Sequence, residues 1–229
     1  MSYQCLFQLR VAGLKEHPIS LQGASLDESF NPKSLNTEGS PEWHTPVVSV
    51  HYPREKALAF PDELWLNTGE RKLDFDIRLD LHGLILSERL TSFMGDDFAG
   101  TFKVAKLHVV NRKGSDISAR PMVYAKPRNP VPVFEPETTV FVRGMVTTGL
   151  FPQEVDLAER IVLREDLSGP IVYPRLHSDF VLISDAVADW LRKESANGVD
   201  IVPVDGFCDR YNDRFTMMDA DGNPVSPFG

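Results

Sequence analysis

The chain has 229 residues and a mass of 25.7 kDa, which is enough for one large domain or two small ones. Apolar residues make up 42% and charged residues 25%, which argues against a mainly disordered chain, a collagen-like chain or a disulfide scaffold. The net charge of −9 disfavours broad contact with nucleic acid or an anionic membrane, because both surfaces would repel the protein.

The N-terminal residues predict a strand followed by a long loop. Alternate apolar side chains from Tyr3 to Val11 indicate a strand with one buried face. Residues 12–46 are rich in Gly, Ser, Pro and Asn, and we expect a loop there. This start lacks the pattern of a signal peptide, and no run of about 18 apolar residues follows it. We therefore expect a cytoplasmic protein with no membrane partner.

The clearest predicted strand covers residues 73–81, where apolar and polar side chains alternate. Because successive side chains of a strand point to opposite faces, we expect one buried face and one face carrying three carboxylates. Asp96 and Asp97 follow in a predicted loop flanked by glycines. Carboxylates that lie close together repel one another, so such a cluster can indicate a surface that binds a basic partner. The alternative is a strand face that is simply exposed to water. The predicted partner-binding residues are Asp74, Asp76, Asp80, Asp96 and Asp97.

A strand, a serine cap and a short helix follow this acidic segment. Ser87 is in position to cap a helix that begins at Glu88, where the helix dipole favours a negative charge. Leu90, Phe93 and Met94 have helical spacing and predict its buried face. A strand is expected from Thr101 to Val110.

The same pattern recurs later, with Ser184 as the cap and Val187, Trp190 and Leu191 at the corresponding helix positions. This recurrence has two possible explanations: an internal duplication, or two unrelated segments that have the same local structure. Several prolines between the two units predict a boundary between an N-terminal portion, 1–126, and a C-terminal portion, 127–229, although one continuous domain is the alternative. We predict an α+β fold of mixed or mostly antiparallel sheets with a few short helices.

No motif in the sequence predicts a cofactor, a metal site or a catalytic group. Phosphate-binding glycine loops and metal-ligand spacings of His and Cys are absent. Cys5 and Cys208 have no motif around them, which favours a reducing compartment and leaves a disulfide between them as the alternative. Residues 219–223 predict a turn.

Two C-terminal segments carry a resemblance to a known family. Residues 179–191 (DFVLISDAVADWL) and 197–204 (NGVDIVPV) resemble the C-terminal signature of a bacterial immunity-protein family that neutralises toxins of polymorphic toxin systems. Residues 60–67 and 84–90 are similar to its earlier segments, so the resemblance covers scattered blocks between 60 and 205. It implies a cytoplasmic inhibitor that binds a cognate toxin without chemistry of its own. The acidic balance agrees with a basic toxin, because opposite charges speed association.

Two other classes of protein remain open at this stage. An enzyme can assemble a site from distant residues, for instance His82 with Asp80 and a serine. A self-assembling structural protein can use residues 12–46 as an arm. The sequence leaves the toxin and the oligomeric state open.

Overall fold

The computed structural model describes residues 1–9, 24–31, 60–80, 83–148, 151–175, 179–194, 196–213, 217–218 and 224–225. The turn predicted at 219–223 and His82 lie outside these residues, as does most of the loop predicted at 12–46. The described part of that loop includes a short strand, β2 (Ser25–Asp27), which the sequence did not predict.

The fold is α+β, as predicted, with two main sheets. The six-stranded sheet has the order β2-β3-β6-β7-β5-β4, and the four-stranded sheet has the order β10-β11-β1-β12. The strands of the first sheet are β3 (Glu63–Thr68), β4 (Ile77–Asp80), β5 (Gly83–Ser87), β6 (Phe102–Asn111) and β7 (Met122–Pro127), besides β2. The strands of the second sheet are β1 (Tyr3–Gln8), β10 (Ile171–Val172), β11 (Phe180–Ser184) and β12 (Val199–Pro203).

The two strand–helix–strand units have the same topology. Helix α1 (Glu88–Thr101) connects β5 to β6, and helix α2 (Asp185–Lys193) connects β11 to β12. In each unit an antiparallel strand lies between the two connected strands: β7 in the first unit and β1 in the second. A further antiparallel strand lies outside each unit, β4 beside β5 and β10 beside β11. The recurrence in the sequence therefore corresponds to a recurrence of the fold.

Both helices begin at the predicted serine caps. The Leu90 amide donates to Ser87 Oγ at 3.3 Å, and the Val187 amide donates to Ser184 Oγ at 3.4 Å. Helix α1 is longer than predicted and continues beyond Gly95, whose positive φ of 63° interrupts it. Glycine adopts this backbone conformation without the steric cost that a Cβ would bring.

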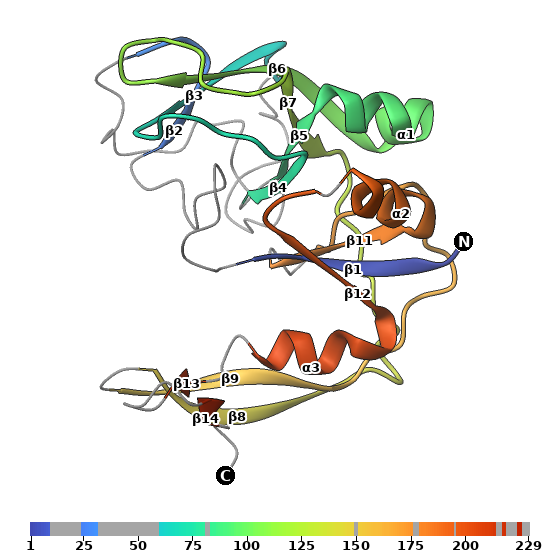
Figure 1. Ribbon diagram of the computed structural model, residues 1–229. Coiled ribbons are helices and arrows are strands. Elements are labelled where there is room, and N and C mark those ends of the chain that lie inside the picture. The colour runs from blue at the N-terminus through green and yellow to red at the C-terminus, as the bar shows by residue number, and fades with distance from the viewer. Residues whose placement is uncertain are drawn as a thin grey trace, which may run out of the picture.

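One hydrophobic core joins the two units. It combines the buried faces of α1 and α2 with inner residues of both sheets, and Figure 1 shows the two helices next to one another. Burial of each large aliphatic side chain contributes about 1.5–3 kcal/mol, so this shared core holds the units together. Its members include Leu6, Leu84, Leu86, Leu90, Met94, Val181, Ile183, Val187 and Leu191.

The first strand of the chain lies inside the second sheet. β1 pairs with β11 and β12, so residues on both sides of the predicted 126/127 boundary build the four-stranded sheet. Cys5 on β1 and Cys208 are free thiols of one core cluster, and burial and Cys208 together raise the pKa of Cys5 to about 12. None of the helices formed by the described residues has the length and apolar character needed to cross a membrane.

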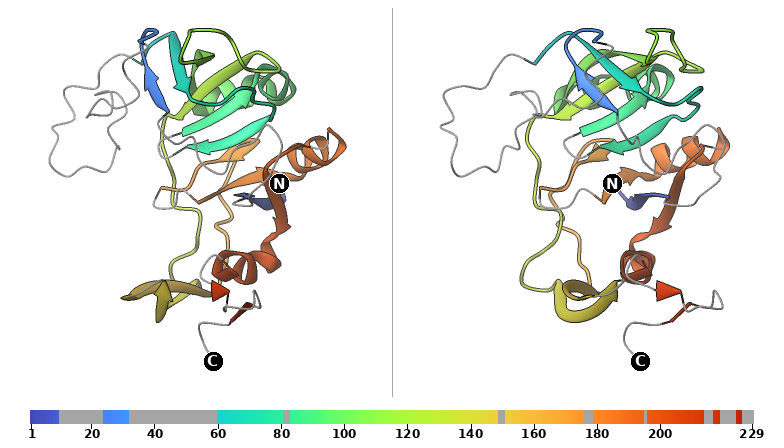
Figure 2. Two further views of the ribbon diagram at one scale, coloured as in Figure 1. Left: turned by 60° about the vertical axis from the view of Figure 1, so that its left-hand side comes forward. Right: turned by 90° about the vertical axis from the view of Figure 1, so that its left-hand side faces the viewer.

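The other end of the molecule carries a two-stranded ribbon. β8 (Val140–Thr148) pairs with β9 (Phe151–Arg160), and α3 (Phe207–Asn212) packs against them after a 3₁₀ turn at Val204–Gly206. Figures 1 and 2 show this ribbon at the end of the molecule away from the six-stranded sheet. Two further short strands, β13 (Met217–Met218) and β14 (Pro224–Val225), pair with each other.

Candidate partner-binding face

The acidic strand predicted over residues 73–81 differs from the structure. Only residues 77–80 belong to β4, while Leu73 forms an isolated bridge with Ser118. Asp76 is only 2% exposed, and Arg78, also predicted on the solvated face, is 6% exposed. The expectation of three solvated carboxylates was therefore wrong, because other parts of the chain cover this face.

Asp76 is the centre of a charged network. Arg89 of α1 donates to its two oxygens from Nε at 2.7 Å and from Nη2 at 2.5 Å. Arg120, in the segment before β7, donates from Nη1 at 2.8 Å, and the Ser87 hydroxyl donates at 2.6 Å. Arg120 also donates to Asp74. Two guanidinium groups and one hydroxyl thus replace the water that a buried carboxylate loses.

These contacts also determine the pKa of Asp76. Burial by itself raises the pKa of this carboxyl, because it disfavours the charged form. Hydrogen bonds from Arg89, Ser87 and Arg120, with the positive charge of Arg120, outweigh burial and bring the pKa below its ordinary value. Asp76 therefore stays ionised and stabilises the start of α1.

The network reaches the second unit through Arg89. Its Nη1 donates to Glu194, just after α2, at 2.7 Å. Its guanidinium lies 5.2 Å from the centre of the Trp190 ring, within the range of a cation–π contact. The Trp190 ring in turn stacks on Phe93, with 5.7 Å between ring centres and 25° between the planes. Phe93 and Trp190 occupy corresponding positions in the two units, so the recurrence places two aromatic rings in contact.

We name the solvent side of the two helices the α1–α2 face. It consists of the half-buried Trp190 and of five exposed residues, Arg89, Phe93, Asp96, Asp97 and Asp189. Phe93 is 46% exposed, so its predicted place on the buried face of the helix was wrong, whereas Leu90 and Met94 are buried as predicted. Asp96 and Asp97 are exposed, but they belong to α1 rather than to a loop.

Asp80 contacts the interior rather than this face. The Tyr124 hydroxyl donates to its Oδ2 at 2.8 Å, and the Tyr173 hydroxyl donates to its carbonyl oxygen at 3.2 Å. Burial, and then the negative charge of Asp80, raise the pKa of both tyrosines. These contacts give Asp80 a structural role at the end of β4.

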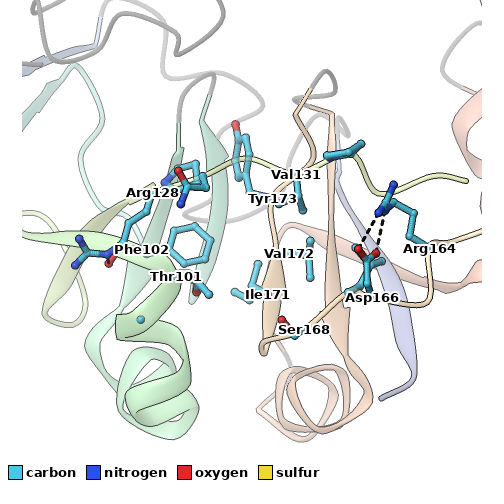
Figure 3. A pocket seen from close by; sticks show the side chains of 15 residues that line it. Thr101, Phe102, Arg128, Val131, Arg164, Asp166, Ser168, Ile171, Val172 and Tyr173 are labelled. Atoms are coloured by element: carbon cyan, nitrogen blue, oxygen red, sulfur yellow. Dashed lines mark hydrogen bonds and ion pairs between the residues drawn. The ribbon is translucent and has the colours of Figure 1, made fainter. Parts of the chain in front are cut away.

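A pocket of about 320 Å³ lies where α1 and β6 meet the second unit. Phe102 and Tyr173 line it together with Ile171, as Figure 3 shows. Arg164 and Asp166 lie at its edge and form a two-bond ion pair with distances of 2.9 and 2.7 Å. Arg128 also lines the pocket, and its Nε donates to the Phe102 carbonyl oxygen at 3.2 Å, so an apolar wall and a positive charge lie together there. Among the described residues, no group of three or more His, Cys, Asp or Glu side chains is arranged to hold a metal.

The α1–α2 face has the chemistry of a protein-binding surface. Aromatic and arginine side chains dominate the centres of such surfaces, and charged residues form their rims. Here two stacked rings and Arg89 lie on the same two helices as the exposed carboxylates of Asp96, Asp97 and Asp189. Sequence reasoning missed Arg89, Arg120 and the aromatic pair. The matching positions of Phe93 and Trp190 were the available signal for the pair.

The comparisons with known proteins agree with a binding role. The family model described as Immunity protein 43 matches residues 13–218, which include both helices and the ribbon. The search of curated proteins gives no match.

Proposed function

This chain belongs to the Immunity protein 43 family, and from that premise we propose that it neutralises a cognate bacterial toxin by binding it. The proposal includes a cytoplasmic location and inhibition by occlusion, with no chemistry contributed by this chain. Family membership supports the toxin-neutralising role, and the aromatic pair supports the choice of surface.

The observation that supports this binding surface is the Phe93–Trp190 stack, in which Phe93 is exposed and Trp190 is half-buried. An aromatic ring that is 46% exposed leaves apolar area in water, and covering that area by a partner is favourable. The contacts of Arg89 with Asp76, Glu194 and Trp190 hold the pair in place before binding. A pre-ordered surface loses less conformational entropy on association.

We propose that the partner is basic. Asp96 and Asp97 on α1 and Asp189 on α2 are exposed on the helices that carry the aromatic pair, and the whole chain has a net charge of −9. Carboxylates at the rim of an interface mainly accelerate association with a positive partner. Asp74, half-buried at the edge of the charged network, can add to this attraction, whereas Asp76 is buried and acts through the fold.

The test is a growth assay with the protein encoded by the neighbouring gene as the toxin probe. We expect co-expression of this chain to restore growth and the two proteins to purify together. Phe93→Ala should weaken rescue, while the matched control Phe30→Ala, a 38% exposed ring elsewhere on the surface, should not. Toxicity without rescue or complex would contradict the proposed function.

A further inference from the structure

The ribbon of β8 and β9 has the features of a second contact surface. Aromatic contacts fix its base: the Phe141 ring lies 5.9 Å from Tyr211 of α3 and 5.8 Å from Phe134. Within the described part of the chain, no third strand pairs with β8 or β9. Unpaired edges are templates for strand addition, and proteins usually cover or interrupt them.

Helix α3 covers the outer edge of β9. The side chain of Asn212 accepts from the Ala158 amide at 2.9 Å and donates to the Ala158 carbonyl at 2.8 Å. This side chain therefore occupies the backbone groups that a neighbouring strand would use on β9. The described residues include no corresponding contact along the outer edge of β8 at Arg143 and Met145.

The register identifies the available groups on β8. Because both backbone groups of Ala158 point away from β8, Ala158 and its partner Phe141 form a non-hydrogen-bonded pair. The pattern repeats every second residue, so the N–H and C=O groups of Arg143 and Met145 point outward. Two outward donors and two outward acceptors are therefore in line along this edge.

The side chains here specify the character of a partner. Met145 is 57% exposed and Val142 is 40% exposed. Glu154 and Asp156 lie directly across the ribbon from Met145 and Arg143, and both acids are exposed. Arg143 and Glu154 form an ion pair of 3.5 Å, but their side chains are 75% and 59% exposed, so water and salt screen it. Arg143 and Met145 lie directly beside an added strand, and the two acids on β9 outweigh the single charge of Arg143, so a strand with apolar and basic side chains fits this face.

We infer that the outer edge of β8 binds an extended, basic segment of the toxin as an added strand, a contact that rests on the proposed function. Main-chain hydrogen bonds at Arg143 and Met145 hold the segment, and Glu154 and Asp156, one strand further in on the same face, attract its positive charges. A second copy of this chain fits less well, because each copy has a net charge of −9 and the two would repel one another.

Proline substitution tests the backbone contact. Met145→Pro removes an N–H that the ribbon does not use, and proline is tolerated on an edge strand when this side faces solvent. The matched control Met145→Thr loses the same apolar side chain but keeps the N–H. With the toxin encoded by the neighbouring gene as the probe, we expect the proline variant to bind at least about tenfold more weakly than the threonine variant.

Hydrogen exchange on the unmodified chain provides a measurement that does not depend on folding of the variant. We expect the amides of Arg143 and Met145 to become protected in the complex. Equal affinities of the two Met145 variants, with unprotected β8 amides, would overturn the added strand while leaving toxin binding intact. Failure of the unmodified chain to bind the toxin would instead reject the proposed function.

A charge variant and the isolated chain complete the test. Glu154→Lys should slow association with the toxin by several-fold, while Asp62→Lys, the same charge change on an exposed residue before β3, should have a smaller effect. A dimer of the unmodified chain that Met145→Pro converts to a monomer would assign the edge to a second copy and overturn the inference.

Discussion

Substitution of Asp76 by asparagine should destabilise the whole protein. The variant keeps the size of the side chain but removes the negative charge that Arg89 and Arg120 share. A hydrogen bond to a charged group contributes about 1.5–3 kcal/mol, and breaking a buried ion pair costs about 3–5 kcal/mol. The arginine side chains are 41% and 24% exposed, so water compensates part of the loss. We expect the free energy of unfolding to fall by about 2–3 kcal/mol.

Urea unfolding measures this change directly. The matched control is Asp74→Asn, which removes a 33% exposed carboxylate from the same Arg120 and should cost less than about 1 kcal/mol. The slopes of the two transitions should agree, so that the midpoints report stability alone. If Asp76→Asn and Asp74→Asn have the same free energy of unfolding, Asp76 is not the centre of the network and the argument fails.

Three further predictions concern pH, the helix caps and the binding face. The pKa of Asp76 in the folded protein lies below its unfolded value of about 3.9, so its contribution to stability is present above that pH and is lost as the pH falls. In urea unfolding at a series of acidic pH values, the unfolding free energy of Asp76→Asn should therefore decrease less steeply with falling pH than that of the unmodified protein. Ser184→Ala should lower the unfolding free energy by about 1 kcal/mol, and Ser87→Ala by more, because Ser87 also donates to Asp76; equal losses would contradict this hydrogen bond. Phe93→Ala should weaken toxin binding at least about tenfold in a titration, with little change in thermal midpoint; unchanged affinity would remove the ring from the interface.

Local signals in the sequence were sufficient to predict the caps and the recurrence. A serine followed by an acid and by helically spaced apolar residues satisfies the free amides of a helix start within one turn of chain. Ser87 and Ser184 therefore begin their helices as predicted, and similar local patterns produce the same topology twice.

The environment of the carboxylates depends on residues that are distant in the chain. An alternating pattern tells which side chains share a face, but not whether another segment covers it. Asp76 is buried because Arg89 and Arg120 lie against it, and neither residue belongs to the predicted strand. Because it is only 2% exposed, Asp76 belongs to the interior of the fold rather than to a solvated strand face.

Long-range pairing also explains what else was missed. β1 completes the sheet of the second unit, although nearly the whole chain separates it from β12. Asn212 gives no sequence signal for its contact with Ala158, since the contact requires α3 to pack beside the ribbon. Phe93 has helical spacing suitable for burial, but Trp190 contacts only one side of its ring and leaves it partly exposed.

The most direct test of the central claim is a titration of the purified toxin with purified chain, with toxin activity as the readout. Binding by occlusion predicts loss of activity in proportion to the added chain, complete near one equivalent, and recovery of active toxin after the two are separated. Progressive inactivation by a small fraction of an equivalent, leaving a toxin that stays inactive after separation, would contradict occlusion and show that the chain acts as an enzyme.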